Sequence, residues 1–155
     1  MISPSNHLFG LDQPKITNLK FQQVHDILNH CSTGDILKIV ELYTGEKIVD
    51  ILSLNSQDFI RFVKWMNKQI ENVNKIYKSL QSEEFDKSDM AYKNAGSEKS
   101  DKYKEKIVYY SIDRNPDSWD RIGEQPFNKV FTMMMIDKDM KDINKQYAKL
   151  MKANG

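Results

Sequence analysis

The amino-acid sequence predicts an all-α fold: an irregular helical bundle around one long central helix, with a flexible polar linker before the C-terminal helices. The first observation is a run of large apolar residues at alternating steps of four and three, a spacing that belongs to a helix: Phe59, Val63, Met66, Ile70, Val73, Tyr77 and Leu80. The second is composition, because 29% of the residues are charged and only six glycines and four prolines occur. Such a composition suits helices better than a turn-rich β fold.

The bulk properties indicate one domain without a preference for polyanions. The length of 155 residues favours a single core, and 23 Lys+Arg against 22 Asp+Glu produce no overall field that attracts nucleic acid or an anionic membrane. The single cysteine, Cys31, excludes an internal disulfide and is typical of a reducing compartment. Residues 1–6 lack the features of a secretion signal, and the longest apolar run, 133–136, is far shorter than the ~20 residues of a membrane span. We therefore expect a cytoplasmic or particle-associated protein.

The first 15 residues are expected to form an extended arm. Pro4, Gly10 and Pro14 surround a small apolar cluster there and disfavour a long regular element. Such an arm either folds back on the core or stays free for a partner.

The first helix is expected to begin with Thr17 or Asn18 as its N-cap and to end at Cys31. Its buried face keeps a helical spacing: Leu19 or Phe21, then Val24, Ile27, Leu28 and Cys31. This spacing indicates a helix with one side against the core.

A second helix is expected at residues 35–43, apolar on most of its circumference and therefore central in the core. Residues 32–34 separate it from the first helix, and Ser32 or Thr33 is its expected cap. Gly45 suits the left-handed position that ends a helix.

Residues 46–54 are predicted to form a further short helix. A strand is the alternative, because 47–51 is rich in β-branched residues. Helix is preferred because residues 54–56 readily form the cap of the next element. Ser56 is the predicted start of the long central helix, and Asp58 places an acid in its first turn.

The long central helix is predicted over residues 56–82. Its apolar face is wider than the seam of a two-stranded coiled coil, because further apolar residues flank the heptad positions: Phe62, Trp65 and Ile76. We therefore expect residues 36–52 to pack on one side of this helix and residues 126–151 on another.

The stretch from 81 to 106 contains seven acids, six lysines and few apolar residues, so it cannot bury enough surface to offset the entropy of ordering it. Residues 107–112 then have β character but no obvious partner strand, so strand and docked helical turn both stay open.

The expected organisation is an arm (1–15), an N-terminal helical part (16–82), a linker (83–106) and a C-terminal helical part on the same core (107–155).

The C-terminal part is predicted to contain a short and then a longer helix. Residues 115–118 form a turn and cap before a short helix around Trp119 and Ile122, which Gly123 ends. Pro126 opens the next helix, whose first face comprises Phe127, Val130, Phe131 and Met134. Heptad-like steps then continue to the end through Met140, Ile143, Tyr147, Leu150 and Met151.

Oxygen-bearing side chains stand at positions 1, 3, 5 and 12 of a possible calcium loop: Asp113, Asn115, Asp117 and Glu124. However, Ser118 occupies the sixth position, where a sharp turn needs glycine, and Asp120 occupies an apolar position. A polar turn and helix cap is the preferred interpretation, and no metal site is predicted.

His25, His30 and Cys31 are close in sequence but do not form a convincing metal site. Residues five apart lie about 140° apart around a helix, so the two histidines diverge. We expect exposed histidines beside one buried cysteine. Nothing in the sequence supplies an oriented base that would make Cys31 a nucleophile.

No glycine-rich phosphate loop is present, and we predict neither a cofactor nor an enzymatic activity. Five lysines follow one side of the last helix: Lys138, Lys141, Lys145, Lys149 and Lys152. Nearby aspartates offset the beginning of this row, and lysines near a helix C-terminus interact favourably with its dipole. A solvated face is preferred over a nucleic-acid site.

The run Met133–Ile136 is the most unusual local feature. Four consecutive apolar residues point all round a helix, so either this helix is buried on every side or part of it binds a partner. The two readings are about equal. The candidate partner-binding residues are Phe131, Met133, Met134, Met135 and Tyr147, and if the chain dimerises this helix should form the seam.

Two parts of the chain resemble the tail assembly chaperones of long-tailed bacteriophages. In residues 19–70, a helix beginning near Lys20-Phe21-Gln22-Gln23 precedes an apolar helix that ends Glu41-Leu42-Tyr43-Thr44-Gly45, and Gln57-Asp58-Phe59 opens a long helix. In residues 117–151, Trp119-Asp120-Arg121-Ile122 and Gln125-Pro126-Phe127 precede a charged terminal helix that contains a tyrosine.

This resemblance implies a helical, non-enzymatic factor in the host cytoplasm. It would bind the tape-measure protein, keep its apolar helices soluble, and be displaced as tail-tube subunits polymerise. A homo-oligomer is possible, and neither nucleic acid nor a membrane is an expected partner. The polar insert 81–106 departs from the family pattern, which leaves a structural component of the virion (neck, tail or baseplate) as the alternative. An enzyme or nucleic-acid binder ranks last.

Overall fold

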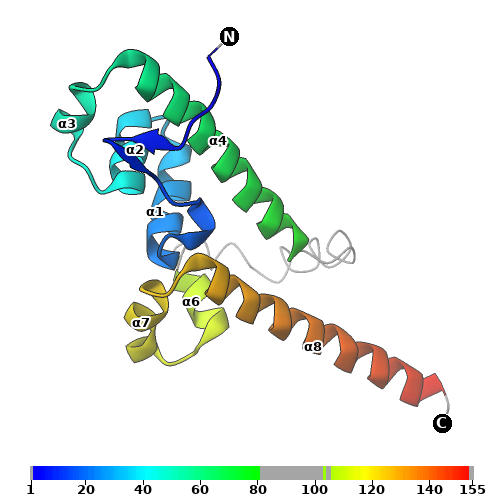
Figure 1. Ribbon diagram of the computed structural model, residues 1–155. Coiled ribbons are helices and arrows are strands. Elements are labelled where there is room, and N and C mark those ends of the chain that lie inside the picture. The colour runs from blue at the N-terminus through cyan, green and yellow to red at the C-terminus, as the bar shows by residue number, and fades with distance from the viewer. Residues whose placement is uncertain (1, 81–102, 104–105, 154–155) are drawn as a thin grey trace.

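Among the residues that the structure describes, the fold is all-α, as predicted, with the addition of a two-stranded hairpin. The computed structural model describes residues 2–80, 103 and 106–153, so the expected linker lies almost wholly outside the described residues. Figure 1 shows α1, α2 and α3 on one side of α4, and α8 extending from beside α6 and α7 to the C-terminus. The described elements are β1 (His7–Leu8), β2 (Leu11–Asp12), η1 (Ile16–Asn18), α1 (Phe21–Cys31), α2 (Ile36–Thr44), α3 (Ile48–Leu52), α4 (Ser56–Ser79), α6 (Lys106–Ile112), η3 (Pro116–Ser118), α7 (Trp119–Gly123) and α8 (Phe127–Ala153).

The N-terminal arm folds back on α4, which is one of the two alternatives that the sequence left open. Strands β1 and β2 pair antiparallel, and Phe9 (φ 55°) and Gly10 (φ 73°) make the left-handed turn between them. The hairpin places Leu8 in the core at 2% exposure. The backbone N–H of Ser5 donates to the carbonyl oxygen of Arg61 at 3.1 Å and fixes the arm beside α4.

Helix α1 begins at Phe21, so the prediction of an N-cap at Thr17 or Asn18 is wrong. The residues before it have an extended backbone because they pair with the segment that enters α8. The N–H of Phe21 donates to the carbonyl of Gln125, and the N–H of Phe127 donates to the carbonyl of Leu19, both at 2.8 Å. These two bonds form an antiparallel bridge that joins the N-terminal and C-terminal parts.

Helix α2 is capped by Asp35, whose carboxylate accepts from the N–H of Lys38 at 3.1 Å. The prediction of Ser32 or Thr33 as the cap is wrong, because their hydroxyls donate to carbonyls at the end of α1 instead. Gly45 takes the predicted left-handed conformation (φ 77°). Only part of α2 is central, since Ile36 is 47% exposed.

Residues 48–52 form helix α3, so the helical alternative there is confirmed and the strand is wrong. Asn55 caps α4 by accepting from the N–H of Gln57 at 2.8 Å. Helix α4 starts at Ser56 as predicted, and its broad buried face includes the flanking residue Phe62, which is 0% exposed.

The core is one cluster with aromatic contacts at both ends of α4. At its beginning, the ring of Tyr43 packs edge-on against that of Phe62, with centroids 5.7 Å apart. At its end, Tyr77 contacts Phe127 of α8 at 5.6 Å, and Phe127 in turn stacks on Phe21 at 5.9 Å. The predicted contact between the long helix and the C-terminal helix therefore exists, but at the first turn of α8.

Residues 107–112 lie in helix α6, which closes the choice between strand and helix. The helix is docked by Tyr109, which is 5% exposed and donates its hydroxyl hydrogen to Oε1 of Gln22 on α1. The predicted turn before α7 is present, with the side chain of Asn115 accepting from the N–H of Asp117. Trp119 donates from Nε1 to the carbonyl of Asp113 at 2.8 Å and closes the connection between α6 and α7.

Candidate protein-binding face on the C-terminal helix

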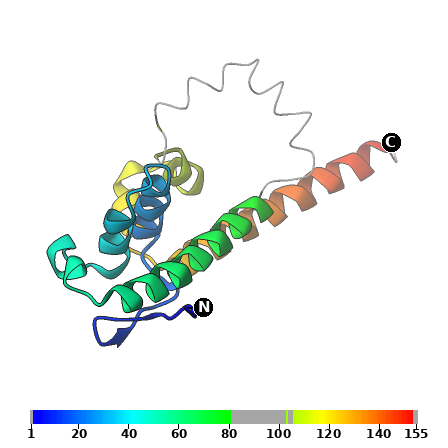
Figure 2. The ribbon, with the colours of Figure 1, turned by 90° about the horizontal axis from the view of Figure 1, so that it is seen from above.

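The C-terminal half of α8 extends away from the rest of the molecule. In both views it continues past the end of α4 toward the C-terminus (Figures 1 and 2). Its first turns are anchored, since Phe127 is 0% and Val130 is 2% exposed. The expectation that residues 126–151 pack along the long helix is therefore wrong beyond those first turns, because nearly every residue after 138 is exposed.

Six large apolar side chains on α8 form one exposed row, which we call the α8 stripe. Each of them is between 52% and 64% exposed: Met133, Ile136, Met140, Ile143, Tyr147 and Leu150. Their spacing alternates between three and four residues, so all six lie on one side of the helix. An unbroken apolar row of this kind normally packs against another helix.

The direction of the α8 stripe is fixed by the aromatic cluster at the beginning of α8. Phe127 and Phe131 stack with centroids 5.8 Å apart and planes inclined by 16°. Phe131 also meets Tyr77 of α4 edge-on at 6.2 Å. Because these rings hold the first turn and a half, the rest of the helix leaves the core in a defined direction.

The lysines that follow Met133 on α8 lie away from the stripe. Lys141 pairs with Asp137 at 2.5 Å, and Lys138 pairs with Asp142 at 3.3 Å, each four residues apart along the helix. In a heptad that places the stripe at a and d, the lysines 138, 145 and 152 occupy f, the position opposite the seam. The lysine row therefore forms a solvated side and leaves the apolar side bare.

The structure separates the five residues that the sequence proposed for partner binding. Met133 and Tyr147 lie on the α8 stripe, at 53% and 64% exposure. Phe131 and Met134 are half-buried against the core, and Met135 is half-buried as well. The alternative in which the methionine run is buried on every side is wrong, because Met133 is open to solvent.

Sequence reasoning missed four members of the stripe: Ile136, Met140, Ile143 and Leu150. Their spacing was visible, but the sequence alone assigned that face to a contact with the central helix. The signal that could have found them is the polar character of the residues around them. Between 138 and 153 every large apolar residue except Met151 lies on this row, which is too narrow for a helix enclosed by several neighbours.

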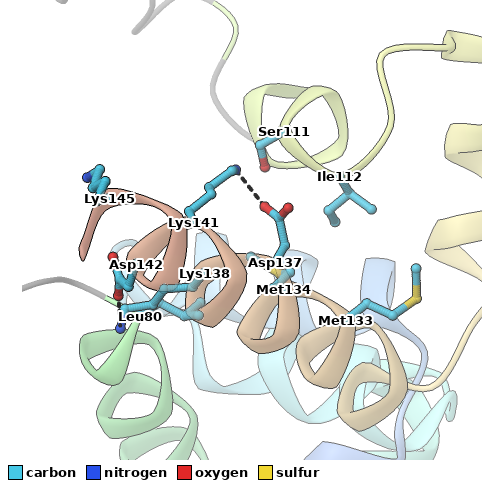
Figure 3. Close-up of a pocket in the computed structure, with 10 residues that line it drawn as sticks. All are labelled: Leu80, Ser111, Ile112, Met133, Met134, Asp137, Lys138, Lys141, Asp142 and Lys145. Atoms are coloured by element: carbon cyan, nitrogen blue, oxygen red, sulfur yellow. Dashed lines mark hydrogen bonds and ion pairs between the residues drawn. The ribbon is translucent and has the colours of Figure 1, made fainter. Parts of the chain in front are cut away.

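Two open grooves lie beside the stripe. The first, of about 370 Å³, adjoins its N-terminal end and is lined in part by Ile112, Ile122, Val130 and Met133. The second, of about 500 Å³, lies between α8, the end of α6 and Leu80, the residue that follows α4 (Figure 3). Figure 3 shows the two aspartates of this groove joined to Lys138 and Lys141 in the ion pairs given above, with Lys145 beside them, so charged side chains stand next to its apolar lining.

His25 is buried, so the expectation of an exposed histidine is wrong at this position. It is 8% exposed, and its Nε2 lies 2.8 Å from the hydroxyl oxygen of Tyr77. His30 instead donates from Nδ1 to the carbonyl of Asp26 at 2.9 Å. Cys31, expected to be buried, is only half-buried, and partial desolvation raises the pKa of its thiol. The His25 contact joins α1 to α4, whereas the His30 bond lies within α1, and the three side chains are not grouped to hold a metal ion.

The residues of the possible calcium loop serve as a turn. The carboxylate of Asp113 accepts from the N–H of Asn115 at 2.9 Å, and this bond, with the nearby Ser118 hydroxyl, lowers the pKa of Asp113. Within residues 2–80, 103 and 106–153, no group of three or more His, Cys, Asp or Glu side chains is placed to hold a metal ion.

No helix in the described part of the chain combines the length and the apolar character needed to cross a membrane.

Comparison of the chain with models of known protein families, with curated proteins and with solved structures finds no match.

Proposed function

We propose that the protein is a non-enzymatic assembly chaperone that binds an α-helix of a coiled-coil partner through the α8 stripe. The observation that carries this proposal is the exposed row of six apolar side chains on a helix that extends from an otherwise packed body. The resemblance to tail assembly chaperones supplies the partner class, a tape-measure-like protein, and tail morphogenesis in the host cytoplasm is the process in which it would act.

The geometry of the stripe supports a helical partner over an extended peptide. Alternating steps of three and four give a mean period of 3.5 residues, which keeps the row facing a neighbouring helix along its whole length. Methionines at 133 and 140 adapt to different neighbouring side chains, which suits a chaperone that meets a long and varied helix. Binding by such a row needs no catalytic group.

The test is co-expression with a long coiled-coil protein whose gene neighbours that of this chain. The wild-type chain should keep the partner in the soluble fraction and co-purify with it. Ile143→Glu, which places a charge in the middle of the stripe, should abolish both effects. Lys145→Glu places the same residue on the opposite side of α8, with a larger change in charge, and should leave both unchanged.

Retention of the partner by Ile143→Glu at the wild-type level would contradict binding through the stripe. The alternative function, a structural component of the virion, is distinguished by mass spectrometry of purified particles. A chaperone is absent from the finished particle, whereas a neck, tail or baseplate component is present in a fixed ratio to the other proteins.

A further inference from the structure

We propose that in the free protein the α8 stripe is covered by the α8 stripe of a second copy of this chain, in antiparallel orientation. This inference concerns the surface used in the proposed function but goes beyond it, because it describes the protein before any partner arrives. A partner helix would then bind by replacing the second copy.

The first argument is the solvent exposure of the C-terminal half of α8. Beyond Asp142, α8 continues to Ala153 with its apolar residues more than half exposed. A helical segment of that length has little stability in water without tertiary contacts. A second helix along the stripe would supply those contacts and remove the six exposed apolar side chains from solvent.

The second argument is the match of side-chain volumes in an antiparallel pair. We assign Met133 to heptad position "a". Position "a" then holds Met133, Met140 and Tyr147, and position "d" holds Ile136, Ile143 and Leu150. In a centred antiparallel pair each a residue faces a d residue of the other copy. The layers then combine Met133 with Leu150, Tyr147 with Ile136, and Met140 with Ile143. Each layer joins a methionine or tyrosine to a branched aliphatic residue, so the seam has even thickness.

A parallel pair would not have this property. It would place Tyr147 against Tyr147, and Ile143 against Ile143 at a d position. Isoleucine at d disfavours parallel two-stranded coiled coils and shifts them to higher oligomers. The composition of the stripe therefore favours the antiparallel pair.

The third argument is charge. The residues that flank the seam at e and g include two acids, Asp137 and Asp139, and no base. In the antiparallel register Asp137 faces Asn144 of the second copy, and Asp139 faces Gln146, so each carboxylate meets an amide that can donate to it. No like charges come together, because the lysines at f point away from the seam.

The fourth argument is the groove at the N-terminal end of the stripe. The antiparallel register brings Leu150 of the second copy to Met133, which lines that groove together with Ile112, Ile122 and Val130. The last residues of the second α8 would enter this groove, whose other lining residues are Asp113, Arg121, Gln125 and Lys129. In a parallel pair, the last residues of the second α8 would lie at the other end of the stripe, far from this groove.

The test uses the purified full chain alone, so its outcome is independent of partner binding. Light scattering across the micromolar range should give twice the chain mass of 18.2 kDa for the wild type. Ile143→Glu should give the single-chain mass, and Lys145→Glu should give the doubled mass. Glutamate is at least as good a helix former as isoleucine, and circular dichroism should show that both variants remain folded. A monomeric wild type, or a dimer that persists in Ile143→Glu, would overturn the proposal.

Disulfide formation tests the orientation. In a background where Cys31 is serine, Met133→Cys alone and Leu150→Cys alone should stay uncrosslinked, whereas a mixture of the two should form one crosslinked dimer on mild oxidation. In the antiparallel pair the two residues at 133 are separated by 17 helical steps, about 25 Å, well beyond the reach of a disulfide. Crosslinking of each variant with itself would show a parallel pair and overturn the proposed arrangement.

Discussion

Nε2 of His25 on α1 lies 2.8 Å from the hydroxyl oxygen of Tyr77 on α4. The two residues are 52 positions apart in the sequence, and their contact joins α1 to α4. The ring of His25 also lies 4.6 Å from that of Phe21, beside the residues that anchor α8. One buried polar contact thus lies where α1, α4 and the beginning of α8 meet.

Removing the hydroxyl at this junction should destabilise the fold. Tyr77→Phe keeps the ring but deprives the buried imidazole of this hydrogen bond, which should cost about 1–3 kcal/mol. Urea denaturation measures the change in the free energy of unfolding. Tyr110→Phe is the matched control, because Tyr110 is 52% exposed, and it should change stability by less than about 0.5 kcal/mol. Equal effects of the two variants would contradict the importance of the buried bond.

The N-terminal hairpin should contribute to the stability of the whole domain. Leu8 and Leu11 are opposite each other in the hairpin, but Leu8 is 2% exposed and Leu11 is 65% exposed. Leu8→Ala should cost about 2–5 kcal/mol, as a large-to-small change in a core does. Leu11→Ala should have almost no effect. Thermal unfolding of both variants makes the comparison, and similar melting temperatures would show that the hairpin does not belong to the cooperative unit.

Gly123 should be sensitive to the addition of a single methyl group. A Cβ at this position would lie 3.1 Å from the Tyr109 hydroxyl and 3.3 Å from Cβ of Gln22. Gly123→Ala should therefore destabilise the protein by about 1–3 kcal/mol through overpacking. Combining it with Tyr109→Phe removes one of the two close contacts, so the double variant should lose less stability than the two single variants together. Strict additivity would contradict the clash with the hydroxyl.

The turn after α6 should make part of the stability depend on pH. The N–H of Asn115 and the hydroxyl of Ser118 lower the pKa of Asp113 below its ordinary value of 3.8. A lowered pKa in the folded state means that the stabilisation is present above pH 3.8 and is lost as the pH falls through the folded-state pKa. Urea denaturation at neutral pH and near pH 3 measures the free energy of unfolding of the wild type and of Asp113→Asn. This free energy should fall less between the two pH values in Asp113→Asn than in the wild type. Identical pH profiles would contradict this role of the carboxylate.

The helical elements were predictable because their signals are local. The spacing of apolar residues in α4, the left-handed Gly45 and the start at Ser56 depend on residues within one or two turns of each other. The start of α1 was not predictable in the same way. It is set by hydrogen bonds from residues 19–21 to residues 125–127, and nothing near Thr17 indicates that distant partner.

The candidate site was predictable in part for a related reason. A heptad row in the sequence indicates that a residue faces another helix, but it does not say whether that helix belongs to the same chain. The row in residues 59–77 is mostly buried or half-buried within the domain, whereas the row in residues 133–150 is exposed. Likewise, His25 has the same sequence context as an exposed helical histidine, and only the approach of Tyr77 encloses it.

The bridge between Lys20 and Pro126 limits how far the protein can fold while it is still being synthesised. The chain leaves the ribosome from its N-terminus, so the strand-like residues before α1 must wait until nearly all of the later chain has been synthesised. During that interval Phe21 lacks the Phe127 ring on which it stacks in the finished fold. Early chains therefore carry an incomplete core, and premature termination before residue 127 should yield species that proteases and folding factors recognise as unfinished.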